Sequence, residues 1–127
     1  MTVSLYSIAI FVTDIDRAVT FYRDTLGWPV TRQGSFGAEF FEDGTHIGVH
    51  PANHPAAKAM VGRETGITLR VDGLLHYCGE LMAKGVRFVK EPTQQSFGIM
   101  AMIADPDGNV FALWDDKVPE GAQGTHP

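Results

Sequence analysis

The sequence has one cysteine, few basic residues and no long hydrophobic run. Cys78 alone cannot form an internal disulfide, which excludes the small disulfide-rich secreted folds and agrees with a reducing cytoplasm. Ten basic side chains against fifteen acidic ones give a formal net charge of −5, so the chain lacks the cationic surface that nucleic-acid binding needs. The apolar segment 3–12 has no basic leader and is too short to cross a bilayer, so we interpret it as a strand.

What is present is the composition of one globular domain. The 127 residues are 44% hydrophobic and 20% charged, which is too apolar for a disordered chain and long enough to bury a core. We expect a single domain over residues 1–117 and a flexible tail over 118–127, where Gly, Pro and polar residues are frequent.

An internal repeat divides this domain into two modules. The segment 8–14 (IAIFVTD) resembles 67–72 (ITLRVD), and each is followed by a helical pattern that ends in a glycine, Gly27 or Gly85. A strand and then two further strands joined by an Asp-Gly turn follow each glycine. The first module covers about residues 3–50, the linker 51–64 and the second module about 65–116.

The periodicity gives each module the order βαβββ. In the first module it predicts a helix that begins after Asp14 or Asp16 and ends at Leu26. One strand precedes this helix, over 3–12, and three follow it, over 28–31, 36–42 and 45–50. In the second module it predicts a helix carrying Leu74, Cys78, Leu81 and Met82, with strands over 67–71, 86–89, 99–104 and 110–114. The linker can hold one helical turn near residues 56–60.

Alternation along the strands gives the two sheet faces different characters. One face is uniformly apolar and belongs against the helices: Ile8, Ile10, Val12, Ile47, Val49, Ile67, Leu69, Val71, Phe111 and Leu113. The other face mixes small, aromatic and polar residues: Ser7, Ala9, Phe11, His46, Gly48, His50, Gly66, Thr68, Arg70, Val110, Ala112 and Trp114. We therefore expect an α+β fold whose mixed, antiparallel sheet forms a ligand-binding cup with the helices on its outer face. The alternative, a solvated outer face, would leave Phe11 and Trp114 in water.

The chain resembles the vicinal oxygen chelate superfamily, the glyoxalase, bleomycin-resistance and extradiol-dioxygenase group. Besides the two βαβββ modules, the motifs that carry the resemblance are Phe21-Tyr22, Leu26-Gly27 and the turn 105–109 (DPDGN). The resemblance covers about residues 3–116 and implies the cup and, at this length, a homodimer. It does not fix one activity, because this fold carries several.

In that family, one residue from each of four strands, usually His or Glu, holds a metal ion. The resemblance places these positions at Ser7, Gly48, Gly66 and Ala112. None of these residues is an ordinary ligand of a divalent transition metal. We therefore expect no metal and no other cofactor.

Other histidines and acids do not restore a metal or catalytic site by pattern alone. His46 and His50 share a strand face but lie about 13 Å apart along it, and prolines exclude a helical pairing of His50 with His54. We interpret Cys78 as a buried structural thiol and the acids Asp105 and Asp107 as turn-forming residues.

Arg70 remains open between three interpretations. Its guanidinium can clamp a ligand carboxylate or phosphate, pair with Glu39 or Glu42, or reach water at the mouth of the cup.

These observations favour a metal-independent protein that binds a small, partly aromatic organic molecule, as in the drug-binding resistance branch that the chain resembles. We assign no catalytic residue. The candidate ligand-binding residues are Ser7, Phe11, Trp28, His46, His50, Thr68, Arg70, Met100, Met102 and Trp114. Two alternatives stay open: a lyase, isomerase or epimerase that uses His46 or His50 as a base, and a regulatory module. The net charge of −5 weakly favours a cationic ligand.

Overall fold

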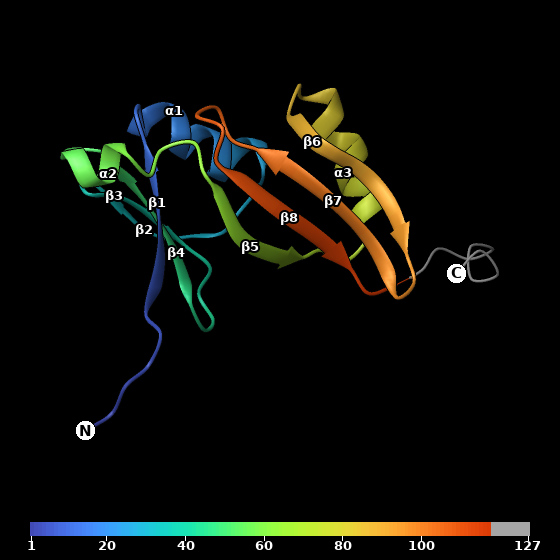
Figure 1. Cartoon of the computed structure of the whole chain (residues 1–127), viewed down its shortest axis with the longest axis horizontal. Coiled ribbons are helices and arrows are strands. Elements are labelled where there is room, and N and C mark those ends of the chain that lie inside the picture. Colours follow the sequence, from blue (N-terminus) through green and yellow to red (C-terminus); the bar gives the residue numbers. More distant parts are fainter. Residues whose placement is uncertain (118–127) are drawn as a thin grey trace. The chain divides into compact units, whose positions relative to one another are not determined.

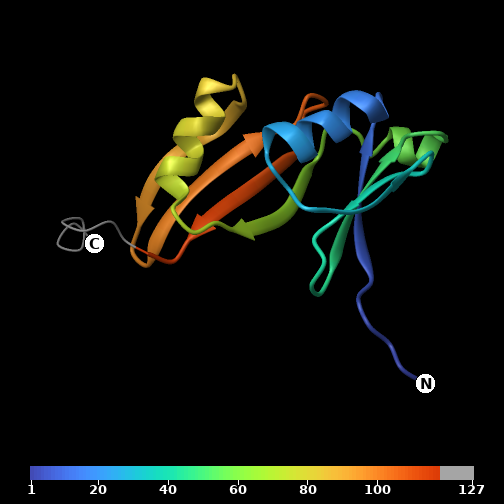
Figure 2. The ribbon, with the colours of Figure 1, turned by 180° about the vertical axis from the view of Figure 1, so that it is seen from behind.

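The computed structural model describes residues 1–117, so the tail expected over 118–127 lies outside the described residues. The described chain divides into two compact units: Met1–Arg63 with Pro106–Asn109, and Glu64–Asp105 with residues 110–117. Each unit contains one four-stranded mixed sheet and has the element order βαβββ, as Figures 1 and 2 show. The expected α+β class is therefore confirmed.

The first unit is built on a sheet of strand order β1-β4-β3-β2, in which β1 and β4 run parallel and the other pairs are antiparallel. Its elements are β1 (Ser7–Val12), α1 (Ile15–Val19), η1 (Thr20–Thr25), β2 (Val30–Gly34), β3 (Gly37–Phe40), β4 (His46–Pro51) and α2 (Pro55–Lys58). The side chains that face the helices are buried, among them Ile10, Val12 and Val49.

The helix expected up to Leu26 is present but not regular. Asp14 caps α1, because its Oδ1 accepts a hydrogen bond from Arg17 N at 3.1 Å. The following turns have π-helical geometry, and the chain leaves the helix at Gly27, whose φ is +74°. Apolar spacing could not reveal this change of helix type, because a single wider turn barely alters the pattern of buried positions.

An aromatic core lies where this helix meets the sheet. Tyr22 is completely buried, with its ring centroid 4.8 Å from that of Trp28 and 5.8 Å from that of Phe40. Trp28 is only 6% exposed. The structure therefore places Trp28, one of the candidate ligand-binding residues, in the core of the first unit.

The second unit has the strand order β5-β8-β7-β6, with β5 and β8 parallel. Its elements are β5 (Glu64–Arg70), α3 (Leu74–Ala83), β6 (Arg87–Gln95), β7 (Gly98–Ala104) and β8 (Val110–Asp115). The strand β6 is longer than the expected 86–89. It tolerates Pro92 because it is an edge strand, and its pairing with β7 contains two irregularities.

Helix α3 covers one face of this second sheet (Figure 2). Leu74, Cys78 and Leu81 point into the core, whereas Met82, expected in the same apolar stripe, is exposed. Burial raises the pKa of the Cys78 thiol to about 11, which suits a structural thiol better than a nucleophile. Among the described helices, none is long and apolar enough to cross a membrane.

Candidate functional site

Each sheet has a distal face, defined here as the face opposite α1 in the first unit and opposite α3 in the second. On the distal face of the first unit, strand pairing places the residues in three rows across β1 and β4. Ser7 pairs with His46, Ala9 with Gly48, and Phe11 with His50. The four candidate residues of this unit's strands, Ser7, Phe11, His46 and His50, thus share one face.

The imidazole of His50 lies over Gly48. A Cβ atom added at Gly48 would lie 2.6 Å from His50 Nε2, so this ring occupies the space that any side chain at position 48 would need. His50 Nδ1 is 3.1 Å from the carbonyl oxygen of Phe36. This contact requires Nδ1 to be the protonated nitrogen, which leaves the Nε2 lone pair on the distal face when the ring is neutral. Phe11 and Phe36 flank the ring, with centroid distances of 6.2 and 6.3 Å.

His46 stabilises an unusual backbone conformation. Its Nδ1 is 2.6 Å from the carbonyl oxygen of Phe41, whose φ of +71° lies in the left-handed region. Tyr6 packs edge-on against the His46 ring at 5.6 Å. His46 therefore stabilises the connection between β3 and β4 and also lies on the distal face.

Glu39 is a buried carboxylate on the same face, paired across the sheet with Gly48. Arg32 Nε lies 3.2 Å from Glu39 Oε1, and the Tyr6 hydroxyl donates to Oε2 at 3.3 Å. These two partners neutralise and hydrogen-bond the carboxylate, as burial of a charge requires.

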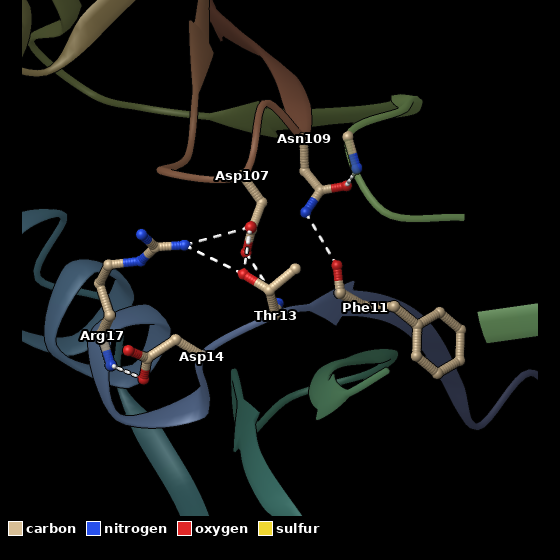
Figure 3. A network of polar contacts seen from close by, with 7 residues as sticks. Phe11, Thr13, Asp14, Arg17, Asp107 and Asn109 are labelled. Atoms are coloured by element: carbon tan, nitrogen blue, oxygen red, sulfur yellow. Dashed lines mark hydrogen bonds and ion pairs between the residues drawn. The ribbon is translucent and has the colours of Figure 1, made fainter. Parts of the chain in front are cut away.

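The turn 105–109 contributes a polar network that sequence reasoning missed (Figure 3). Asp107 accepts hydrogen bonds from Thr13 N at 3.0 Å and Thr13 Oγ1 at 2.6 Å, and its Oδ1 lies 3.1 Å from Arg17 Nη2. We had assigned Asp107 only a turn-forming role. The sequence does show a second acidic residue in this turn, but it does not show which distant residues this side chain contacts.

Asn109 is completely buried and connects three backbone groups. Its Oδ1 accepts from Gly62 N at 3.0 Å and Arg63 N at 3.2 Å. Its Nδ2 donates to the Phe11 carbonyl oxygen at 3.1 Å (Figure 3). Arg63 Nη2 donates to the Ala9 carbonyl oxygen at 2.8 Å. Because β1 is an outer strand of its sheet, these two side chains satisfy carbonyl groups on its unpaired edge.

On the distal face of the second unit, the candidate residues also lie in rows across the strands. Arg70 pairs with Trp114, which pairs with Met100, and in the next row Thr68 pairs with Ala112, which pairs with Met102. All five candidate residues of this unit, Thr68, Arg70, Met100, Met102 and Trp114, therefore occupy two adjacent rows.

Trp114 is held in place by its neighbours. Its indole lies over Gly98, where an added Cβ would approach Cζ2 at 2.7 Å. The indole Nε1 donates to Asp116 Oδ1 at 2.6 Å, and Asp116 Oδ2 lies 2.8 Å from Arg70 Nε. The observed partner of Arg70 is thus Asp116 and not Glu39 or Glu42, and its side chain is 72% exposed.

The residues at the four metal positions implied by the family resemblance do not fit a metal ion. The His50 ring fills the space at Gly48, and Gly66 has a φ of +73°, which a histidine or glutamate rarely adopts. Ser7 and Ala112 add no strong ligand. Within residues 1–117, no three His, Cys, Asp or Glu side chains gather as a metal site would require. We therefore derive no chemistry through a metal.

A cavity of about 220 Å³ lies on the α3 side of the second unit, away from the distal face. Its lining includes Leu75, Ile99 and the buried Asp115. Burial raises the pKa of Asp115, but hydrogen bonds from the backbone N–H groups of Lys117, Leu74 and Gly73 outweigh it, so the pKa lies below its ordinary value. This carboxylate accepts hydrogen bonds from the first N–H groups of α3. Its place at the polar end of the cavity is therefore accounted for by helix capping, and no ligand is needed to explain it.

Two βαβββ units with mixed sheets define the class of protein to which this chain belongs. The chain is a member of the Glyoxalase/Bleomycin resistance protein/Dioxygenase superfamily, whose family model matches residues 4–113.

Known proteins resemble the chain over most of its length. It is 30% identical to the uncharacterized protein YurT of Bacillus subtilis, covering 83% of this chain and 93% of YurT. The structure of TnmS3, an antibiotic binding protein from Streptomyces sp. CB03234, is 27% identical with a TM-score of 0.76, covering 92% of this chain and 99% of that one. A superfamily member from Sphaerobacter thermophilus shares the fold at 24% identity, with a TM-score of 0.77 and coverage of 90% and 98%.

Proposed function

We propose that the protein binds a small, partly aromatic organic molecule without a metal ion and without changing it chemically. The observation that carries the proposal is the replacement of metal ligands by small residues next to flat or flexible apolar side chains. Gly48 lies under the His50 ring, and Ala112 lies between Thr68 and Met102. Such a surface offers contact area to a planar ligand but no Lewis acid.

The distal face of the second unit supports stacking. The indole of Trp114 is fixed by Asp116 and Gly98, so little conformational entropy is lost when a ring packs against it. Met100 and Met102 can adapt their side chains to ligands of different outline. We propose Thr68 and Arg70 as polar groups at the border of this surface. On the first unit, we propose Ser7, Phe11, His46 and His50 as ligand-binding residues of that unit's own distal face.

The similarity to TnmS3 supports a ligand of antibiotic type, since that protein is described as antibiotic binding and the chains align over most of their lengths. We therefore propose sequestration of a toxic or antibiotic-like compound as the biological role.

Metal analysis and ligand-induced stabilisation test this proposal together. The purified protein is screened by thermal shift against planar aromatic and antibiotic-like compounds, with and without a chelator. We expect a concentration-dependent rise in Tm that the chelator does not change, and recovery of the ligand unaltered by mass spectrometry. Stoichiometric Zn²⁺, Ni²⁺, Mn²⁺ or Fe²⁺ after gentle purification, a chemically altered ligand, or no stabilisation by any compound would overturn it.

We also propose a homodimer and a cytoplasmic location. Within the described chain, β2 and β6 pair on one side only and leave edges for another chain to cover. A single-chain mass by light scattering at micromolar concentration would exclude the dimer. The buried thiol of Cys78 is compatible with a reducing compartment, and recovery of the protein in a secreted fraction would exclude the location.

A further inference from the structure

The arginines of the described chain differ in which groups neutralise their positive charge. Six arginines lie within residues 1–117. Four of them form ion pairs: Arg17 with Asp107, Arg23 with Asp24, Arg32 with Glu39, and Arg70 with Asp116. Arg87 has no such partner among the described residues but is exposed, where water solvates its charge at little cost.

Arg63 fits neither group. It is partly buried, and its Nε is shielded from solvent without a hydrogen-bond partner. Its Nη2 donates to a neutral acceptor, the Ala9 carbonyl oxygen, and no acidic side chain among the described residues pairs with it. A cation that has lost part of its hydration and has no counter-ion gains more from a nearby anion than an exposed one does.

Hydrogen bonds hold Arg63 at its backbone N–H and at its guanidinium. Asn109 Oδ1 accepts hydrogen bonds from both Gly62 N and Arg63 N, and Gly62 has a φ of +79° that lets the chain turn there. The side chain then extends to the edge of β1 at Ala9. A group placed this rigidly is preorganised to bind.

Aromatic side chains lie on the strand that Arg63 contacts. Phe11 is two residues from Ala9 on β1, on the distal face, and its ring lies 6.2 Å from His50 and 6.5 Å from His54. The carboxylate of Glu39 on the same face is already paired with Arg32. Arg63, in contrast, forms no ion pair with a described residue although its Nε is shielded from solvent.

We infer that Arg63 binds the carboxylate of an aromatic ligand whose ring packs against Phe11 and His50. This inference rests on the proposed binding function and specifies the charge of the ligand. It reverses the weak expectation from the net charge of −5, because a partly desolvated local cation outweighs a charge spread over an exposed surface. A guanidinium suits this task, since its N–H groups can donate to both carboxylate oxygens.

Three probes of one shape and different charge test the inference: 2-naphthoate, naphthalene-2-methanol and 2-naphthylmethylamine. Their dissociation constants are measured by calorimetry for the wild type, Arg63→Gln and Arg87→Gln. Arg87→Gln is the matched control, because it removes the same charge from an exposed arginine without an ion partner. We expect the wild type to bind 2-naphthoate most tightly. Arg63→Gln should weaken that binding about tenfold or more and leave the alcohol within about twofold, whereas Arg87→Gln should change neither.

Two measurements on the wild type do not depend on how well a variant folds. Raising the salt from about 50 to about 500 mM should weaken binding of 2-naphthoate but not of the alcohol. The NMR signal of the shielded Arg63 Nε–H should shift on addition of 2-naphthoate.

The possible results separate the two proposals. If Arg63→Gln lowers Tm but leaves the preference for 2-naphthoate intact, Arg63 only covers the edge of β1 and the inference is wrong. If the alcohol or the amine binds the wild type as well as 2-naphthoate does, the inference fails while the binding function stands. If none of the three probes binds and the broader ligand screen also gives no stabilisation, both proposals fail.

Discussion

The two distal faces belong to units with the same βαβββ arrangement, but their side chains interact differently. In the first unit, polar side chains bind one another: His50 reaches Phe36, His46 reaches Phe41, and Glu39 reaches Arg32. In the second unit, the Trp114 indole lies against Gly98 and the neighbouring positions carry thioethers and small residues. The same sheet therefore supports a hydrogen-bonded face in one unit and a stacking face in the other.

A shared device underlies this difference. In each unit, a glycine leaves space for the ring that defines the face, namely Gly48 for His50 and Gly98 for Trp114. Gly48 is one of the four positions that the resemblance assigns to metal ligands, and it has a positive role here, because its missing side chain lets the His50 ring lie against the sheet. Substitutions at these points test whether the two faces are independent.

The largest effect is expected for Asn109→Ala, which should damage the first unit selectively. It removes the three hydrogen bonds to Gly62, Arg63 and Phe11 from a fully buried site. We expect a loss of about 3 kcal/mol in the free energy of unfolding, measured by urea denaturation. The exposed Asn53→Ala serves as the control. Hydrogen exchange should show faster opening of β1 than of β8, and equal acceleration of both strands would contradict a local role.

The next largest effect compares the two glycines. In Gly98→Ala, the new methyl meets the Asp115 carbonyl oxygen as well as the Trp114 ring, so backbone must move. In Gly48→Ala, it meets only the movable imidazole of His50. We expect a loss of about 2–3 kcal/mol for Gly98→Ala and about 1 kcal/mol for Gly48→Ala, measured as changes in Tm and urea midpoint. Equal losses would show that the His50 ring is as firmly fixed as backbone.

Trp114→Ala should separate ligand binding from stability. The indole is only partly buried, so its removal should cost the fold little, whereas a stacked aromatic ligand should lose about 2 kcal/mol of binding free energy. Calorimetry with a ligand identified by the thermal-shift screen measures this loss. Leu75→Ala, which truncates an exposed apolar residue on α3, is the control. Unchanged affinity in Trp114→Ala would remove the second unit's distal face from the binding site.

How much the sequence reveals also differs between the two faces. Strand alternation placed Trp114 on the same side of the sheet as Thr68 and Arg70, because a period of two determines the side of the sheet. The run 99–103 is too uniformly apolar for alternation to assign a face to Met100 and Met102, which the structure pairs with Trp114 and Ala112. Alternation gave no side for Trp28, which comes before β2 and packs with Tyr22 in the core. The residue at which a strand begins is hard to predict from a sequence pattern. For a residue outside the strand, the alternation of the strand does not predict where the side chain points.

The polar network shows a second limit of sequence reasoning. Asp107 and Thr13 are separated by 94 positions, and local propensity explains only why Asp107 suits a turn. The partner of Arg70 was missed for the opposite reason. Asp116 follows β8 directly and lies next to Trp114 on the same strand end, but we considered only glutamates of the first module. The hydrophobic periodicity of a sequence does not predict the tertiary contacts of long polar side chains.

The smallest effect, about 1 kcal/mol, is expected for Asp115→Asn, which sharpens the contrast between the helix caps of the two units. Asp14 caps α1 locally, whereas Asp115 reaches α3 from a distant strand and is buried. Three backbone N–H groups overcome the effect of burial and lower the pKa of Asp115, so its stabilisation is present above the unfolded pKa of about 4 and is lost as pH falls through the folded value. The wild type should therefore exceed Asp115→Asn in Tm at neutral pH and approach it as the pH falls through the lowered pKa of Asp115, while the exposed Asp72→Asn should show a smaller difference. A difference in Tm that is independent of pH would mean that the carboxylate acts through its shape and not through its charge.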